Sequence, residues 1–387
     1  QDKFEYLNKK AGEIAVNAKK RFPHVFVAGG LPPQNLTYEA DKRDEKEIIR
    51  NIKDQAKALN PYVDFFYFLS LSLSFLFVKY GINVIQGKNL LQNIRAEGPV
   101  THLKKRNTPT MGGIIIIPIF LLIVLLANFP GLELKILFLL TILGFFIIGL
   151  YDDFLGIKNK INKGLNVKEK LFLQIFLAII FIVFAWNNNY INSNIAIPFN
   201  SDIDIGKLIL PLAILTIVSL SNSVNLTDGL DGLAAGCCSI VFCGLGVEIL
   251  LTNDPSLIVF SLLSFSMTGL CLGFLAFNKF PAKIFMGDTG SLCLGSIIGM
   301  ICVLTNNYLT TLIFSGIFLI EAFSVILQVS YFKITKFLHQ EGKRLLLMSP
   351  LHHHFELKGI HENVIVENFW KTNIMLVILG IVLKISI

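Results

Sequence analysis

Long apolar runs separated by short polar segments dominate the chain from about residue 65 onward. A membrane-spanning helix needs about 20 largely apolar residues, and a backbone inside a membrane satisfies its hydrogen bonds within such a helix. We expect spans near 66–86, 112–130, 133–150, 171–187, 206–221, 233–251, 257–276, 291–306, 309–330 and 370–386. The pattern predicts an all-α polytopic membrane protein, with about ten transmembrane helices over residues 65–387.

Residues 1–64 lack this pattern. They are polar and mixed in charge, with helical periodicity near 8–21 and 44–58 and a strand-like segment at 25–28. This order predicts a short βα-like fragment of a soluble α/β domain. The fragment loosely resembles part of a homocysteine S-methyltransferase barrel, but so short a piece cannot bury a core alone. We expect a fusion or a gene-assembly artefact rather than a working domain.

The loops between the expected spans fall into two classes by charge. Lysine and arginine gather in the loops at 87–111, 151–170, 277–290 and 331–369. They are absent from the alternate loops at 131–132, 188–205, 252–256 and 307–308. The positive-inside rule therefore places the basic loops, together with the short loop 222–232, in the cytoplasm.

Composition supports the membrane interpretation. The 387 residues are 53% hydrophobic and only 16% charged, against roughly 25% charged in a typical soluble domain. The net charge of +7 is explained by cytoplasmic loops that face anionic lipid, so we expect no nucleic-acid partner. The six cysteines lie in or beside apolar stretches, which predicts reduced thiols rather than a disulfide framework.

Two adjacent acids, Asp152 and Asp153, directly follow an apolar run. Paired carboxylates at a helix end suit a hard cation, or a base and a metal ligand that work together. The alternative is an ordinary acidic helix terminus. The pair becomes informative only when other polar clusters lie on the same side of the membrane.

The polar segment 225–232 separates two apolar runs and carries Asn225, Asp228 and Asp231 at every third position. If the segment is helical, this spacing places the three side chains along one side. Its glycines would let a ligand or another backbone come close. The alternative is a solvated loop between two helices.

Asp288 falls just before the expected start of the next span, at the membrane boundary. Magnesium binds proteins through one or two carboxylates plus substrate phosphates. An aspartate at this place could hold the metal while the backbone N–H groups of the helix N-terminus meet phosphate. The alternative is a plain helix N-cap.

Basic residues and histidines complete the candidate chemistry. The lysines of segment 98–113, with Lys168 and Lys170, could neutralise a diphosphate or a lipid phosphate. The alternative for each is topological charge alone. Consecutive histidines such as His352, His353 and His354 point in different directions, which argues against one zinc site. They could still donate to phosphate or carry a proton near neutral pH.

The stretches 108–113, 152–153, 225–232, 285–291 and 350–356 together resemble the phospho-N-acetylmuramoyl-pentapeptide transferase family. The resemblance runs from about residue 67 to the C-terminus. Within the wider superfamily of polyprenyl-phosphate sugar-phosphotransferases, segment 349–356 points to the muramoyl-pentapeptide branch. One departure is clear: the family has an aromatic, arginine-containing lead-in before its first helix, and the βα-like fragment takes that place here.

The resemblance implies a ten-helix bundle, a homodimer, in the bacterial plasma (inner) membrane with a cytoplasmic cleft. The implied reaction moves phospho-N-acetylmuramoyl-pentapeptide from its uridine diphosphate (UDP) carrier to undecaprenyl phosphate. It releases uridine monophosphate (UMP), forms lipid I for peptidoglycan synthesis and uses Mg²⁺. The partners implied are the UDP-linked donor, undecaprenyl phosphate and membrane lipid.

The resemblance also implies roles for individual residues. Asp288 would be the magnesium ligand, and Asp152 a base or nucleophile with Asp153 beside it. The nucleotide-sugar site would be lined by Asn225, Asp228, Asp231, Asn278 and Phe285, with Phe285 stacked on uracil. The phosphates would contact Lys105, Thr110 and Lys168 or Lys170. A catalytic His352, with His353 and His354, would complete the pocket.

Two routes and two rival functions stay open. The lipid phosphate could attack the donor directly, with Asp152 as base, or Asp152 could first form an aspartyl-phosphate. A sister enzyme would use a UDP-N-acetylhexosamine donor. An ion-coupled transporter would place its ionisable groups at mid-membrane on broken helices, whereas these acids gather at loop edges.

Overall fold

The computed structural model describes residues 45–87, 105, 108–158, 164–195, 203–252 and 254–385, with side chains from residue 66 onward. The chain divides into two compact units, Gln1–Phe68 and Leu69–Ile387. In the first unit, the described part is the beginning of helix α2 (Glu45–Gly87), where a helix was expected at 44–58. The expected helix at 8–21 and the strand at 25–28 lie outside the described residues.

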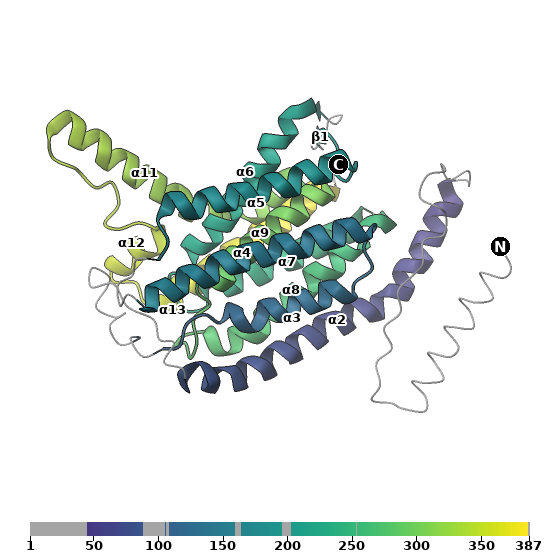
Figure 1. Ribbon diagram of the computed structural model, residues 1–387, viewed down its shortest axis with the longest axis horizontal. Helices are drawn as coiled ribbons and strands as arrows, with labels where there is room; N and C mark the ends of the chain where they lie inside the picture. Colours follow the sequence, from purple (N-terminus) through teal and green to yellow (C-terminus); the bar gives the residue numbers. More distant parts are fainter. Residues whose placement is uncertain are drawn as a thin grey trace. The chain divides into compact units, whose positions relative to one another are not determined.

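The second unit is a helical bundle (Figure 1). After α2 its helices are α3 (Gly113–Leu126), α4 (Leu132–Lys158), α5 (Val167–Asn187), α6 (Ile209–Thr227), α7 (Leu233–Leu251), α8 (Ile258–Asn278), α9 (Asp288–Thr305), α10 (Tyr308–Phe314), α11 (Gly316–His339), α12 (Leu351–Leu357) and α13 (Glu362–Ile385). Two 3₁₀ turns, η2 (Gly206–Leu208) and η3 (Pro255–Leu257), precede α6 and α8. The strands β1 (Asn194–Ile195) and β2 (Ile203–Asp204) pair antiparallel in the loop before η2.

The predicted all-α polytopic fold is confirmed. Nine helices of the described chain are long and apolar enough to cross a membrane, and α3 is a shorter apolar helix of 14 residues. The second expected span, 112–130, therefore ends early. Helix α3 stops at Leu126, before the turn that contains Pro130 and Gly131.

Two further expected spans differ from the structure. The span at 309–330 is interrupted at Ser315, between α10 and α11, and α11 continues to His339. Figure 1 shows α11 projecting away from the other helices of this unit. The last span begins at Glu362 instead of near 370. The first turns of α13 are polar, so hydropathy alone could not include them in the helix.

Helix α9 lies at the centre of the bundle, and each of its residues after Asp288 is buried. Small residues bring its backbone close to α6: a Cβ added at Gly295 would lie 2.2 Å from the Leu220 carbonyl oxygen, and one at Gly299 would lie 2.7 Å from Ile217 Cα. Such close backbone approach is typical of helix packing in membranes. It places Asp288, the first residue of α9, among the ends of the neighbouring helices.

Candidate functional site

Three acids meet at the start of α9, and we call Asp152, Asp153 and Asp288 the carboxylate cluster. The Lys170 Nζ on α5 forms an ion pair with Asp288 Oδ2 and lies 3.6 Å from Asp152 Oδ1. Asn225 Nδ2 on α6 donates to Asp288 Oδ1 at 2.7 Å. The expected convergence of these residues is therefore present, with one ammonium between two carboxylates.

Asp153 caps the first turn of α9. Its carboxylate accepts from the Asp288 N–H at 3.1 Å, from the Thr289 N–H at 2.9 Å and from Thr289 Oγ1 at 2.6 Å. The first N–H groups of a helix have no partner within the helix, and a negative charge is favourable there. These two N–H groups thus bind Asp153, which corrects the expectation that they meet phosphate.

Asp152 is held differently. It accepts the Leu165 N–H at 3.0 Å, and its side chain retains 17% exposure. A general base needs an accessible carboxylate within reach of the proton that it removes. Both adjacent acids are partly exposed, but both oxygens of Asp153 accept from the first turn of α9, so Asp153 has the geometry of a support for Asp288 and Asp152 stays the candidate for a reacting group.

Close packing of α4 on α9 fixes the carboxylate cluster. A Cβ added at Gly149 would lie 2.3 Å from the Asp288 carbonyl oxygen, a backbone atom that cannot move aside cheaply. Gly149→Ala should therefore lower stability by about 1–3 kcal/mol and, by displacing Asp288, lower turnover by about 10- to 100-fold. Thermal unfolding in detergent and a turnover assay would measure both effects.

Gly156 on the same helix provides the matched comparison, because an added Cβ there meets nothing within 4 Å. Alanine favours a helix over glycine by about 1 kcal/mol. We expect Gly156→Ala to be at least as stable as the parent protein. Equal losses at positions 149 and 156 would contradict the proposed steric cause.

The segment 225–232 is helical only in part, which corrects the expectation of three side chains on one helical side. Helix α6 ends at Thr227, and Gly232 has a left-handed φ of 79°, which glycine adopts at little cost. Asp228 at the turn accepts the Gly287 N–H. Burial, followed by the charges of Asp288 and Asp153, raises the pKa of Asp228 to about 8.

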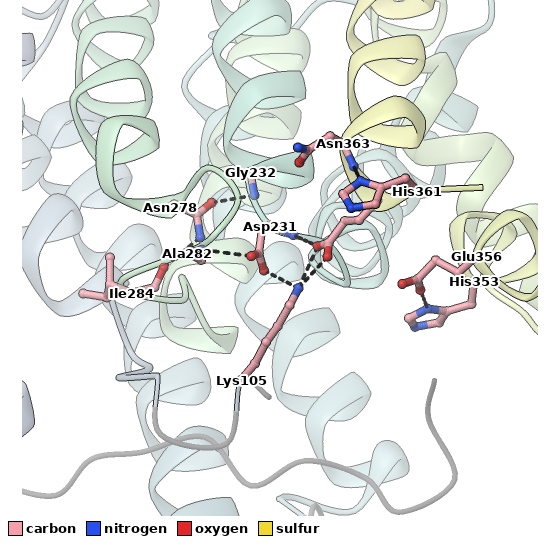
Figure 2. Close-up of polar contacts among 11 residues, drawn as sticks. Lys105, Asp231, Gly232, Asn278, Ala282, Ile284, His353, Glu356, His361 and Asn363 are labelled. Atoms are coloured by element: carbon pink, nitrogen blue, oxygen red, sulfur yellow. Dashed lines mark hydrogen bonds and ion pairs between the residues drawn. The ribbon is translucent and has the colours of Figure 1, made fainter. Parts of the chain in front are cut away.

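A second cluster surrounds Lys105, just before α3 (Figure 2). Its Nζ lies 2.6 Å from Asp231 Oδ1 and 2.7 Å from Glu362 Oε1. Asp231 Oδ2 accepts the Ala282 N–H at 2.9 Å, and Asn278 Oδ1 accepts the Gly232 N–H at 3.1 Å. The expected residues Lys105, Asp231 and Asn278 thus lie together, with the Lys105 ammonium paired to carboxylates.

The histidines of α12 occupy three different environments. His352 is fully buried; its N–H donates to Glu321 Oε1 at 3.2 Å, and its Nδ1 lies 3.2 Å from Glu321 Oε2. A Cβ added at Gly229 would lie 2.1 Å from His352 Nε2, so the ring packs against the 228–232 turn. His353 Nδ1 lies 2.7 Å from Glu356 Oε2 (Figure 2). His354 Nδ1 accepts the Leu347 N–H.

Of the remaining expected residues, some lie within the site and others on the surface. The Phe285 N–H donates to the Pro109 carbonyl oxygen at 2.8 Å, so the segment before α3 fixes the Phe285 backbone. Thr110 is buried in that segment. The side chain of Lys168 is exposed, whereas Lys170 lies within the carboxylate cluster. The structure thus distinguishes two lysines that the sequence left as alternatives.

The donor set allows a test of the expected magnesium site. Within the described part of the chain, no group of three His, Cys, Asp or Glu side chains could hold a metal ion. Magnesium, however, is commonly bound by one or two carboxylates plus substrate phosphates. Asp152 and Asp288 already converge on one cation, the Lys170 ammonium. The residues fit a magnesium ion that is bound together with substrate.

Two site residues were missed at the sequence level. Glu321 lies in an apolar span and is fully buried; an ionisable residue inside a span is itself a signal of function. Glu362 lies in the polar segment before the expected last span, where no pattern distinguishes it from a solvated loop acid. Only the first of the two carried a usable signal.

Comparison with known families places these motifs in context. The family described as Glycosyl transferase family 4 matches residues 135–306. Residues 105–117, which contain Lys105 and Thr110, match the phospho-N-acetylmuramoyl-pentapeptide-transferase signature 1. The two matches cover both the Lys105 segment and the helices that carry the carboxylate cluster.

Curated relatives are similar over most of the chain. A phospho-N-acetylmuramoyl-pentapeptide-transferase of Prochlorococcus marinus strain MIT 9312 is 58% identical over 83% of this chain and 89% of its own length. The protein of the same name from P. marinus subsp. pastoris strain CCMP1986 is 56% identical over 83% and 90%. That of Synechococcus sp. strain CC9311 is 42% identical over 79% and 83%.

Proposed function

The chain belongs to the phospho-N-acetylmuramoyl-pentapeptide-transferase family, and we propose that it carries out the reaction of that family. It transfers phospho-N-acetylmuramoyl-pentapeptide from the UDP carrier to undecaprenyl phosphate and yields lipid I and UMP. The observation that carries this proposal is the convergence of Asp152, Asp288 and Lys170 at one end of an apolar bundle. Phosphoryl transfer depends mainly on positioning and on neutralising charge.

The proposed mechanism assigns separate tasks to the residues of the site. Lys170 places positive charge beside the donor diphosphate, and Asp153 keeps the first turn of α9 fixed so that Asp288 stays in place. Asp152 accepts the proton of the lipid phosphate or orients its oxygen toward the β-phosphorus of the donor. Asp288, together with substrate phosphates, would hold magnesium, which supplies charge neutralisation for the departing UMP when bound.

The proposal also covers the membrane location of the chain and its oligomeric state. The chain would be a multi-pass protein of a bacterial plasma membrane, with the carboxylate cluster at the cytoplasmic side. The charge of the loops supports this orientation: Lys105, Lys158 and Lys170 lie at the end of the bundle that carries the cluster. A homodimer, as expected from the family, is part of the proposal.

A donor-substrate assay tests the function directly. The purified protein in detergent, given undecaprenyl phosphate and Mg²⁺, should release UMP from UDP-N-acetylmuramoyl-pentapeptide and form a lipid-linked product. We expect at least about 100-fold lower turnover with UDP-N-acetylglucosamine, since discrimination of this size follows from a site built for the missing groups. Chelation of magnesium should abolish the product, and equal turnover without divalent metal would contradict the metal assignment.

The same assay addresses the rival functions. Preferred use of a UDP-N-acetylhexosamine would identify a sister enzyme for another glycopolymer. UMP release that depends on the donor substrate would exclude an ion-coupled transporter. Of the acids that argue against transport, Asp152 lies in the last two turns of α4, Asp288 opens α9 and Asp228 lies in the turn after α6, whereas coupling ions bind at mid-membrane positions.

A further inference from the structure

Glu362 is an acid of the described chain with several contacts and no assigned role. Both of its oxygens accept from Lys105 Nζ, at 2.7 and 2.8 Å, and Oε1 also accepts the Asp231 N–H at 2.7 Å. The residue opens α13, and its exposed fraction is 7%. One side chain thus joins three segments that are far apart in the sequence: the approach to α3, the 228–232 turn and the start of α13.

The arrangement around Lys105 also includes an aromatic contact. Lys105 Nζ lies 5.8 Å from the centre of the Phe280 ring, and the His361 ring meets the same ring edge-on at 5.4 Å. His361 directly precedes Glu362 in the sequence. The start of α13 and the α8–α9 loop therefore enclose the Lys105 ammonium together.

Among the described side chains, the charges in this cluster do not balance. Two carboxylates, Asp231 and Glu362, face one described ammonium, that of Lys105, in a largely buried place. Buried charges persist only where hydrogen bonds satisfy them. Stability alone would require only one acid opposite Lys105, because a second buried acid adds a desolvation cost. A second acid is therefore better explained by a need for fixed geometry.

We propose that Glu362 is a positioning residue for the transfer reaction: it fixes the Lys105 ammonium and the 228–232 turn in one orientation. This inference rests on the proposed function, since Lys105 and Asp231 belong to the donor site expected for the family. The turn also carries Asp228, which accepts the Gly287 N–H beside Asp288. A shift of the turn would consequently reach the carboxylate cluster.

Glutamine at position 362 is the sharpest substitution, because it keeps the shape and removes the charge. Glutamine has one acceptor oxygen, whereas Glu362 uses two oxygens toward Lys105 and one of them also toward the Asp231 N–H. The NH₂ group of the glutamine would face either the Lys105 ammonium or the Asp231 N–H, and both of these are donors. We expect kcat/KM for the donor to fall by about 10- to 100-fold in Glu362→Gln, with partial recovery in Glu362→Asp.

Glu367→Gln is the matched control. Glu367 lies on the same helix, has a side chain that is 62% exposed and meets only the exposed Lys371 at 3.8 Å among the ion pairs of the described residues. We expect its turnover to stay within about twofold of the parent. Equal activity of the Glu362→Gln and Glu367→Gln proteins would overturn the proposal.

A double substitution separates positioning from a general contribution to folding. Lys105→Met leaves two described carboxylates without their cation, so adding Glu362→Gln should cause a smaller loss of kcat/KM than it causes in the parent and should raise the thermal midpoint of the Lys105→Met protein. Independent effects would instead multiply. Multiplicative losses in kcat/KM would show that Glu362 does not act through Lys105, and the proposal would fall.

Hydrogen exchange gives a measurement that does not depend on activity. The Asp231 N–H donates to Glu362, so peptides that cover 228–233 should exchange at least about tenfold faster in Glu362→Gln than in the parent and the Glu367→Gln protein. Unchanged exchange would contradict the proposed anchoring. If the parent protein shows no transfer activity, the proposed function fails, while the exchange result still decides whether Glu362 anchors the turn.

Discussion

Replacing Asp288 with asparagine is expected to reduce turnover by about 1,000-fold or more, because several kcal/mol of transition-state stabilisation depend on this charge. Asparagine keeps the size of the side chain but removes the negative charge that pairs with Lys170. It would also place an amide NH₂ group opposite that ammonium or opposite Asn225 Nδ2. Steady-state UMP release at increasing magnesium would measure the effect.

Asp254→Asn is the appropriate control for this loss. Asp254 lies in the loop before α8, where its carboxylate caps the η3 turn by accepting the Ser256 N–H. Asparagine caps a helix about as well as aspartate, so we expect near-parental turnover and elution from a sizing column. An Asp288→Asn protein that recovers parental turnover at saturating magnesium would refute the role of Asp288 as a ligand.

The second large effect is expected at Lys170. Lys170→Met removes the described cation that lies between Asp152 and Asp288, so the two carboxylates would repel each other and the donor diphosphate would lose its ammonium. We expect kcat/KM for the donor to fall by at least about 100-fold, since truncating one partner of a close charged pair costs several kcal/mol. Part of the loss should appear as a higher KM.

The same substitution at Lys168 tests which of the two lysines contacts phosphate, a choice that the sequence left open. Lys168 precedes Lys170 by two positions on α5, and its side chain is exposed. We expect Lys168→Met to change kcat/KM by less than about threefold, as an exposed charge contributes little. A larger loss of kcat/KM in Lys168→Met than in Lys170→Met would show that Lys168, and not Lys170, contacts the substrate.

Hydropathy was sufficient to predict the helical class and most of the spans, because a membrane imposes both length and apolarity on every crossing segment. It misjudged α13, whose first turns carry Glu362 and Glu367, and the break at Ser315, where both flanking segments are equally apolar. Periodicity cannot locate a break that leaves hydropathy unchanged, nor include polar turns that are stabilised by tertiary contacts.

The site was predictable at the level of residue types and less so at the level of contacts. Asp152, Asp288 and Asn225 meet as expected, since each lies at the same end of a span. The sequence could not show that Asp153 binds the first N–H groups of α9, or that Asp231 and Glu362 share Lys105. Both contacts join segments more than 100 positions apart, which only the folded bundle brings together.

The bond between Asp153 and the first turn of α9 has a consequence for substrate choice. It ties α4 to α9 at one point, and the absence of space at Gly149 prevents either helix from sliding past the other. The carboxylate cluster therefore lies at a closely packed contact between α4 and α9, which we expect not to adjust to the sugar or peptide of the donor. We expect selection among donors to come from side chains outside this contact between α4 and α9.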